Sequence, residues 1–120
     1  MKKGILLEKS REFAIRIIKL SRFLEQQKSF AIANQLMKCG TSIGANIHEA
    51  QDAQSKKDFV SKLNIALKES RETEYWLYVI TESELVAANK TIDLKDALIE
   101  IISMLVSAIK TTKMKYPNET

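Results

Sequence analysis

The sequence predicts an all-α protein, an antiparallel up-down-up-down four-helix bundle. Apolar residues recur at intervals of three and four along four long segments, which is the spacing of one helical face. The 120 residues include only three glycines and one proline, so the turns that strands and hairpins need are nearly absent. Connections of a few residues between long helices force neighbours to run antiparallel. A chain of this length is expected to form one domain, residues 1–120, with its own core.

The first helix is predicted at about residues 5–27 and the second at about residues 29–53. The apolar face of the first helix consists of Leu6, Phe13, Ile17, Leu20 and Leu24. The apolar face of the second consists of Ile32, Leu36, Cys39, Ile43, Ile47 and Ala50. Each helix therefore has one face that a neighbour must cover.

The third helix is predicted at about residues 56–87 and the fourth at about residues 94–114. Ser55 is the expected N-cap of the third, because Asp58 completes a capping box with Asp in place of the usual Glu. Its buried face is predicted to be Phe59, Leu63, Ala66, Leu67, Ser70, Leu77 and Leu85. Asp93 is the expected cap of the fourth helix. The stripe of that helix is Leu94, Leu98, Ile101, Leu105, Ala108 and Ile109.

The segment GTSIGAN, residues 40–46, places two glycines inside the second helix. Each glycine in a helix interior costs about 0.5–1 kcal/mol relative to alanine, so the missing side chains must serve some purpose. A phosphate-binding loop would need the pattern GxxxxGK after a strand, and neither the lysine nor the strand is present. Gly40 and Gly44 are therefore predicted to let a neighbouring helix approach closely.

Polar residues beside this strip predict a structural network between the second and third helices. Gln35, Ser42, Asn46 and Glu49 form a row next to the apolar stripe of the second helix. Glu74 falls inside the stripe of the third helix, where a carboxylate must be paired, hydrogen-bonded or protonated. Acid-base chemistry by Glu69, Glu72 and Glu74 is the alternative. A network that includes Glu72 and Glu74 is the stronger interpretation, because no nucleophile or ligand set accompanies them.

Three of the predicted apolar arcs are too wide for a bundle that stands alone. The residues beyond the core stripes are Ile15, Phe23, Ile65, Trp76, Val79, Ile99, Ile102 and Val106. Contiguous exposed apolar surface usually marks an interface, so these residues predict a homo-oligomer. Scattered exposed apolar residues are the alternative.

The formal net charge is +4, and the excess is concentrated at the N-terminus. Residues 1–28 contain eight Lys/Arg against three Glu. Such asymmetry permits a polyanionic partner, although a solvated helix face has the same composition. The candidates for phosphate contacts are Arg11, Arg16, Lys19 and Arg22, followed by a second cluster of Lys110, Lys113 and Lys115.

Signatures of an enzyme, a metal site or a cofactor site are absent from the sequence. His48 is the single histidine and Cys39 the single cysteine, too few for a zinc site and without the Glu-x-x-His pairs of a di-iron bundle. A Cys39 nucleophile paired with His48 is disfavoured, because the two point to different faces of the helix. A lone cysteine, with no apolar run of transmembrane length, predicts a cytoplasmic protein with no membrane contact.

Two motifs resemble a known family. GTSIGANIHEAQ at 40–51 and DFVSKLNIALKESRETEYWL at 58–77 are similar to the four-helix-bundle proteins encoded in intervening sequences of bacterial large-subunit ribosomal RNA genes. The accessory variability determinant proteins of diversity-generating retroelements are related to that family. The resemblance extends from KSREFA at 9–14 through the fourth helix. It implies an antiparallel bundle that assembles as a homopentamer. It also implies, through the retroelement relatives, nucleic acid and a reverse transcriptase as partners of a basic surface.

Two functions follow as expectations. The first is a non-enzymatic oligomeric module that binds RNA or DNA through the basic surface of the first helix. The second is a protein-protein interaction scaffold with no nucleic-acid partner, in which the basic face is solvated or used between subunits. The sequence does not name the partner.

Overall fold

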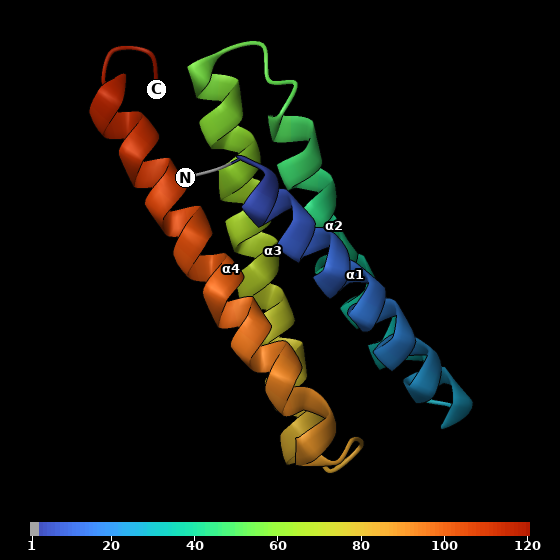
Figure 1. Cartoon of the computed structure of the whole chain (residues 1–120). Helices are drawn as coiled ribbons and strands as arrows, with labels where there is room; N and C mark the ends of the chain where they lie inside the picture. The colour runs from blue at the N-terminus through green and yellow to red at the C-terminus, as the bar shows by residue number, and fades with distance from the viewer. Residues whose placement is uncertain (1–2) are drawn as a thin grey trace.

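The computed structural model describes residues 3–120, which form four α-helices and, within that range, no strand. They are α1 (Lys3–Gln26), α2 (Phe30–Ala50), α3 (Lys56–Glu82) and α4 (Ala88–Lys115). The all-α prediction is confirmed. Figure 1 shows the helices packed lengthwise, in a body that measures 49 × 21 × 20 Å.

The helices are arranged as a four-sided bundle. Within the described range, α2 contacts α1 and α3, and α4 contacts α3 and α1, whereas the pairs α1/α3 and α2/α4 do not meet. The bundle therefore has four sides, each formed by two neighbouring helices. The α1/α4 side and the α2/α3 side are opposite each other.

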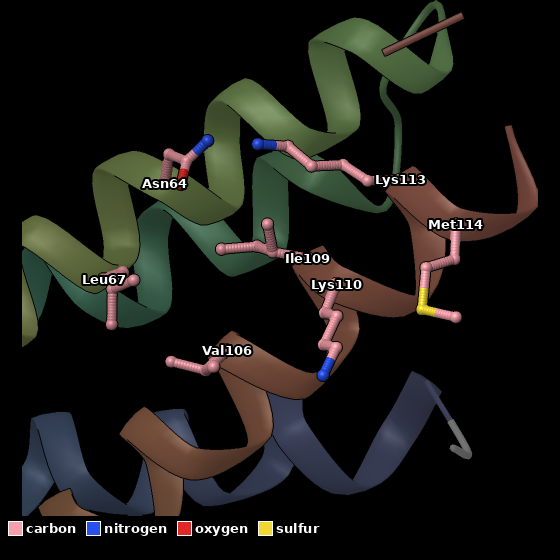
Figure 2. A pocket seen from close by; sticks show the side chains of 7 residues that line it. All are labelled: Asn64, Leu67, Val106, Ile109, Lys110, Lys113 and Met114. Atoms are coloured by element: carbon pink, nitrogen blue, oxygen red, sulfur yellow. The ribbon is translucent and has the colours of Figure 1, made fainter. Parts of the chain in front are cut away.

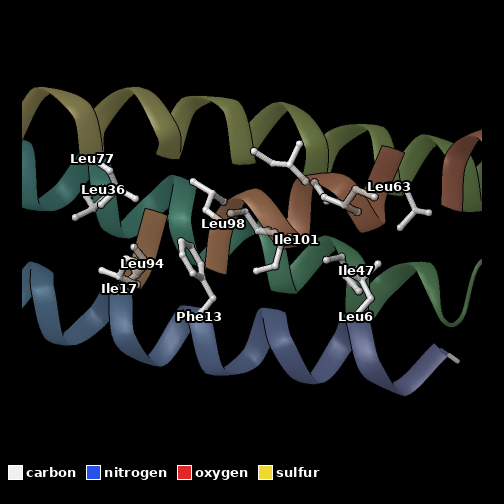
Figure 3. Close-up of a cluster of buried hydrophobic side chains, with 14 of the residues drawn as sticks. Leu6, Phe13, Ile17, Leu36, Ile47, Leu63, Leu77, Leu94, Leu98 and Ile101 are labelled. Carbon is white, nitrogen blue, oxygen red and sulfur yellow. The ribbon is translucent and has the colours of Figure 1, made fainter. Parts of the chain in front are cut away.

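The core fills the centre of this square along its whole length (Figure 3). Each helix contributes fully buried aliphatic or aromatic side chains, such as Phe13, Leu36, Leu77 and Leu105. The apolar stripes expected from the sequence are buried except for Ile32, Phe59, Leu67 and Leu85, which are half-buried at the edges. The spacing of three and four thus identified the inward faces.

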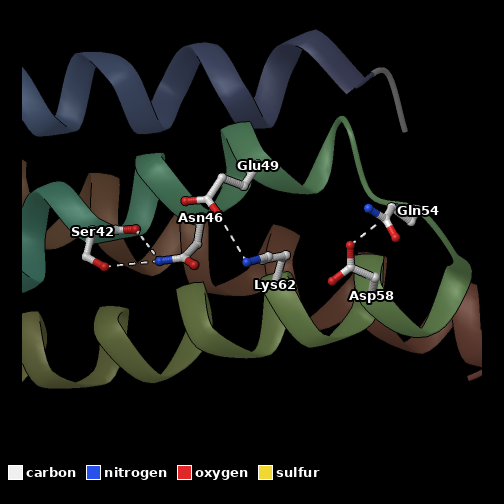
Figure 4. Close-up of polar contacts among 6 residues, drawn as sticks. All are labelled: Ser42, Asn46, Glu49, Gln54, Asp58 and Lys62. Carbon is white, nitrogen blue, oxygen red and sulfur yellow. Dashed lines mark hydrogen bonds and ion pairs between the residues drawn. The ribbon is translucent and has the colours of Figure 1, made fainter.

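The start of α3 follows the sequence expectation closely. Ser55 has extended backbone, and its hydroxyl accepts a hydrogen bond from the Asp58 N–H at 3.0 Å. The Asp58 carboxylate accepts the N–H of Gln54 at 3.2 Å, one residue before the N-cap (Figure 4). Two otherwise unpartnered backbone donors are thereby satisfied.

The α3–α4 connection differs from the expectation. α3 ends at Glu82, and α4 begins at Ala88, so Asp93 lies inside α4 and the prediction that it caps the helix is wrong. The chain turns at Glu84, whose φ of 64° is in the left-handed region that glycine usually occupies. Val86 is then buried, and its N–H donates to the Ile80 carbonyl at 3.2 Å. Without a glycine, the sequence carried no signal for this turn.

Candidate nucleic-acid and self-assembly surfaces

The two glycines of α2 lie against α1. A Cβ atom on Gly40 would stand 2.7 Å from Cγ2 of Ile17, which is closer than two carbon atoms can pack. A Cβ atom on Gly44 would stand 3.3 Å from the backbone carbonyl oxygen of Ser10. The absent side chains therefore allow α1 and α2 to approach closely, and the strip is used inside the molecule.

Three residues of the polar row of α2, Ser42, Asn46 and Glu49, are on the other side, toward α3 (Figure 4). Asn46 donates to the carbonyl and hydroxyl oxygens of Ser42 at 2.9 and 3.1 Å, so both partners belong to α2. Glu49 reaches across to α3 and pairs with the Lys62 ammonium at 3.0 Å. This row therefore links α2 to α3 through the Glu49–Lys62 ion pair.

Glu74 does not occupy the core, so its predicted burial is wrong. Its side chain is exposed and lies 3.5 Å from Arg71 in the same helix. The buried positions of α3 include two small polar residues, Ser70 and Thr73, whose hydroxyls donate to the carbonyls of Ala66 and Glu69 at 2.8 Å. A hydroxyl that donates to a carbonyl of its own helix can be buried at little cost. Ser70 was expected on the buried face of this helix, whereas Thr73 was not.

Carboxylates gather on α3 beside α2. Burial raises the pKa of Glu69, and the neighbouring negative charge of Glu72 raises it further. Glu72 accepts a hydrogen bond from the indole N–H of the half-buried Trp76 at 3.3 Å. Burial also raises the pKa of the Cys39 thiol, which lies beside Thr73 and near both glutamates. The neighbouring ammonium of Lys68 acts in the opposite direction on the pKa of Glu69, so this surface carries charges of both signs.

Arg11, Arg16, Lys19 and Arg22 of α1 are exposed, and the structure brings two of them near a basic residue of another helix. Arg16 and Lys19 line a groove of about 280 Å³ between α1 and α4, together with Lys90. The Lys90 ammonium lies 4.2 Å from the centre of the Phe23 ring. The sequence did not associate Lys90 with Arg16 and Lys19, because Lys90 lies far from them in the chain. Arg11 and Arg22 are exposed on α1 but do not line this groove.

On the same side of the bundle, Lys9 of α1 pairs with Glu100 of α4 at 2.7 Å. This contact raises the pKa of Lys9 through a hydrogen bond to the Glu100 carboxylate. Both side chains are substantially exposed, so the pair adds little to stability.

The C-terminal lysines divide between two places. Lys110 and Lys113 line a groove of about 410 Å³ between α3 and α4, and the Lys113 side chain extends toward Asn64 of α3 (Figure 2). An adjoining hollow of about 400 Å³ shares Asn64 and Lys113 and adds Lys57 and Lys68. No Asp or Glu lines either hollow. We call the set Lys57, Asn64, Lys68, Lys110 and Lys113 the lysine groove.

Lys115 belongs to a different hollow of about 550 Å³ at the end of the bundle, with Lys56 and Tyr116. There the Lys56 ammonium lies 4.5 Å from the centre of the Tyr116 ring. Lys57 and Lys68 were missed as partners of the C-terminal cluster because they come from a helix far away in the sequence.

The apolar residues predicted for an interface separate into three groups. Ile15, Ile65, Ile99 and Val106 are exposed, and Phe23, Trp76 and Val79 are half-buried against the core. Ile102 is buried, so its assignment to an exposed interface is wrong. It lies next to the core stripe of α4, one turn after Leu98. Tyr75, Tyr78 and Ile92 are further exposed side chains that the sequence did not single out.

Two further properties of the described residues bear on function. Residues 3–120 contain no cluster of three or more His, Cys, Asp or Glu that could hold a metal ion. None of the four helices has an apolar stretch long enough to cross a membrane. His48 is exposed, and Cys39 is a buried free thiol.

Fold and surface together define an all-α four-helix protein with charged, grooved sides. The chain belongs to the family described as 23S rRNA-intervening sequence protein, which matches residues 2–107. It is also similar to a crystal structure from Bacteroides thetaiotaomicron, a protein with unknown function from the S23 ribosomal protein family. That similarity has 47% sequence identity and a TM-score of 0.85, and covers 88% of this chain and 98% of the other. The search of curated proteins found no match.

Proposed function

We propose that this protein is a non-enzymatic, self-assembling helical module that binds nucleic acid. Its unit is an antiparallel up-down-up-down bundle, and its assembly is the homopentamer implied by the family resemblance. Self-assembly is supported by four exposed apolar side chains, Ile15, Ile65, Ile99 and Val106. A partner that covers such side chains removes apolar surface from water, which lowers the free energy of the assembly. The free thiol of Cys39 fits a reducing compartment such as the cytoplasm.

The observation that carries nucleic-acid binding is the lysine groove. Four lysines from α3 and α4 line two adjoining hollows, and no Asp or Glu side chain lines either of them. The amide of Asn64 is a further hydrogen-bond donor for a phosphate oxygen. On α1, by contrast, Glu8 and Glu12 alternate with the basic residues, which weakens the field there. We therefore propose the lysine groove as the main phosphate-binding surface, with Arg11 and Arg22 of α1 as secondary contacts.

Salt-dependent binding tests this proposal. A Lys110→Gln, Lys113→Gln variant should bind RNA or DNA more weakly than the unmodified protein. Its slope of log affinity against log salt should be shallower by about 1.4–1.8, because two phosphate contacts are lost. Lys38→Gln, an exposed lysine of α2 outside the groove, is the matched control and should leave the slope unchanged. Equal slopes for both variants, or no affinity at low salt, would refute the proposal.

A protein-protein interaction scaffold is the second candidate, favoured by the exposed Tyr75, Tyr78 and Ile92. In this case a protein partner, such as a reverse transcriptase, covers these side chains, and no nucleic acid binds. Recovery of a protein from the native cell that no longer binds a Tyr78→Ser variant would favour this candidate. Tyr75→Ser and Tyr78→Ser variants that keep every partner would argue against it.

A further inference from the structure

The hollow of about 550 Å³ at the end of the bundle, which we call the end hollow, lies outside the lysine groove. Figure 1 shows the C-terminal end of α4, in red, at the same end of the molecule as the α2–α3 connection, in green. Both segments line the end hollow together with α2 and α3, whereas no described residue of α1 lines it. The end hollow thus extends from α2 to α4, two helices that do not meet. Small-molecule sites have volumes of roughly 300–1,000 Å³, so its size suits one small ligand.

Part of the wall of the end hollow is apolar. It consists of Ala50, Ala53, Phe59 and Ala108. Ala50 and Ala108 are buried, and the half-buried ring of Phe59 packs against the core, so this part of the wall is held in place. Three of the four side chains are single methyl groups, which leave the space in front of them open. A surface of methyl groups beside an aromatic ring can pack against a flat ring such as a nucleobase.

The end hollow also has positive charge. Lys56 and Lys115 line it, and among residues 3–120 no Asp or Glu side chain does so. The Lys56 ammonium lies 4.5 Å from the centre of the Tyr116 ring, a contact that keeps this cation at the wall. The nearby Asp58 carboxylate accepts the backbone N–H of Gln54 at 3.2 Å and is not part of the lining. The charge of the hollow therefore favours an anionic group.

Hydrogen-bonding groups complete the lining. The Gln51 side-chain amide donates to the Ile47 carbonyl at 3.2 Å, and its oxygen remains as an acceptor. The Thr112 hydroxyl likewise donates within its own helix, at 2.8 Å, and keeps acceptor capacity. The Ser55 hydroxyl accepts from the Asp58 N–H at 3.0 Å, so its own proton can be donated. Acceptors suit the amino groups of a base, and a hydroxyl donor suits a phosphate or sugar oxygen.

The end hollow borders the lysine groove. On α3, Lys56 of the hollow precedes Lys57 of the groove, and on α4, Lys115 follows Lys113 of the groove by two residues. Successive Cα atoms are about 3.8 Å apart, so the lysines of the two sites are close neighbours. A strand whose phosphates lie in the lysine groove can therefore place its end in the hollow. The base that enters must be unpaired, because pairing would occupy the edge that faces the wall.

We propose that the end hollow binds a nucleoside phosphate, with the base against the apolar wall and the phosphate at Lys56 and Lys115. The inference rests on the proposed function in one respect, since we take the nucleotide to be the unpaired end of a strand that the lysine groove holds. The protein should then prefer single strands to blunt duplexes. A free mononucleotide has the same chemistry, so the two sources need separate measurements.

Filling the end hollow in the full-length protein tests the site. Ser107 and Thr111 line it from the exposed face of α4, and Ser107→Leu, Thr111→Leu should occupy the space of the base. Affinity for a short 5′-phosphorylated single strand, measured by fluorescence anisotropy, should fall at least about fivefold as base stacking is lost, with duplex affinity unchanged. Ser103→Leu, at an exposed serine of α4 outside the hollow, is the matched control and should change neither affinity. Circular dichroism and the urea midpoint check folding. Unchanged single-strand affinity in the filled variant would overturn the proposal.

A fluorescent base gives a second measurement, which uses the unmodified protein. The fluorescence of 2-aminopurine depends on how the base is stacked. A strand that carries it at an end should change in fluorescence upon binding more than a strand that carries it in the middle. Equal changes at all positions of a bound strand would count against an end nucleotide in the hollow.

Free nucleotides test the second source. By calorimetry, adenosine 5′-monophosphate should bind more tightly than adenosine or inorganic phosphate, because each of these lacks one half of the ligand. The filled variant should lose this binding. Lys56→Gln, Lys115→Gln should keep the affinity for adenosine and lose the advantage that the phosphate confers. Binding of the nucleotide that survives in the filled variant would place it elsewhere and overturn the assignment.

The lysine groove variant separates this inference from the proposed function. Lys110→Gln, Lys113→Gln should weaken the binding of single strands and duplexes alike while leaving adenosine 5′-monophosphate bound. Strand binding that this variant weakens and the filled variant does not would leave the proposed function standing and overturn the end hollow. Nucleotide binding that the filled variant abolishes, with no affinity of any form for RNA or DNA, would support the hollow as a nucleotide site and refute the proposed function.

Discussion

Replacement of Gly40 by alanine should destabilise the bundle, although alanine is the better helix former. The new Cβ would lie 2.7 and 2.9 Å from two carbon atoms of Ile17, whose side chain is fully buried. Alanine contributes about 1 kcal/mol of helix propensity, whereas overpacking a core costs about 1–3 kcal/mol. The free energy of unfolding of Gly40→Ala should therefore fall by about 0–2 kcal/mol, as measured by urea denaturation.

Ala45→Gly calibrates the propensity term on the same helix. Ala45 is exposed, so its replacement changes backbone freedom and little packing. It should cost about 1 kcal/mol. The difference between this value and the effect of Gly40→Ala then gives the cost of the contact with Ile17.

A double-mutant cycle tests the cause directly. Ile17→Ala alone should cost about 2–5 kcal/mol, because it leaves a cavity in the core. In the double variant, the methyl group that Gly40→Ala introduces enters that space. The combined loss should then be smaller than the sum of the single losses by about 1–3 kcal/mol. Two results together would contradict this reasoning: Gly40→Ala stabilises the protein by the full propensity gain, and the two substitutions are additive in the cycle. Close approach of α1 would then not be the reason that residue 40 is glycine.

Three further predictions concern the cap, the thiol and the ion pair. Ser55→Ala should lower the free energy of unfolding by about 1 kcal/mol, as the Asp58 N–H loses its acceptor; an unchanged urea midpoint would contradict the capping role. Cys39 should react with a thiol reagent only after unfolding, because it is 1% exposed and its pKa is raised; rapid labelling of the native protein would contradict this. Since the folded pKa exceeds the unfolded one, this thiol's contribution to stability should also decline as pH rises past about 8.5, a decline that Cys39→Ala should remove. Lys62→Met should cost less than about 1 kcal/mol, because its partner Glu49 is exposed; a loss of several kcal/mol would indicate a stronger α2–α3 link than the ion pair supplies.

The ends of the helices show where sequence reasoning succeeded and failed. The Ser55 cap was predictable because a hydroxyl and a backbone N–H three residues later are local partners. The turn at Glu84 was not, since nothing in its immediate sequence favours a left-handed backbone. Burial of Val86 and the hydrogen bond between the Thr81 and Thr91 hydroxyls, at 2.9 Å, accompany that turn, and both depend on packing between α3 and α4.

The candidate surfaces divide in the same manner. The sequence identified Arg16, Lys19, Lys110 and Lys113 as basic, because clusters within one helix are visible as short intervals. It did not associate Lys90 with the first pair. Such neighbours come from distant parts of the chain, and their meeting depends on which helices share a side of the bundle.

By itself, the sequence determined four helices, their inward faces and the glycine strip of α2. These features depend on hydrogen bonds and side-chain spacings within a few residues, which the order of residues specifies directly. Only the tertiary structure decided that Ile102 is buried, that Glu74 is exposed and that Lys57 and Lys68 join the C-terminal lysines in one groove. Those outcomes depend on the rotation of each helix about its own axis and on its neighbours, because the boundary between core and surface is drawn by all four helices together.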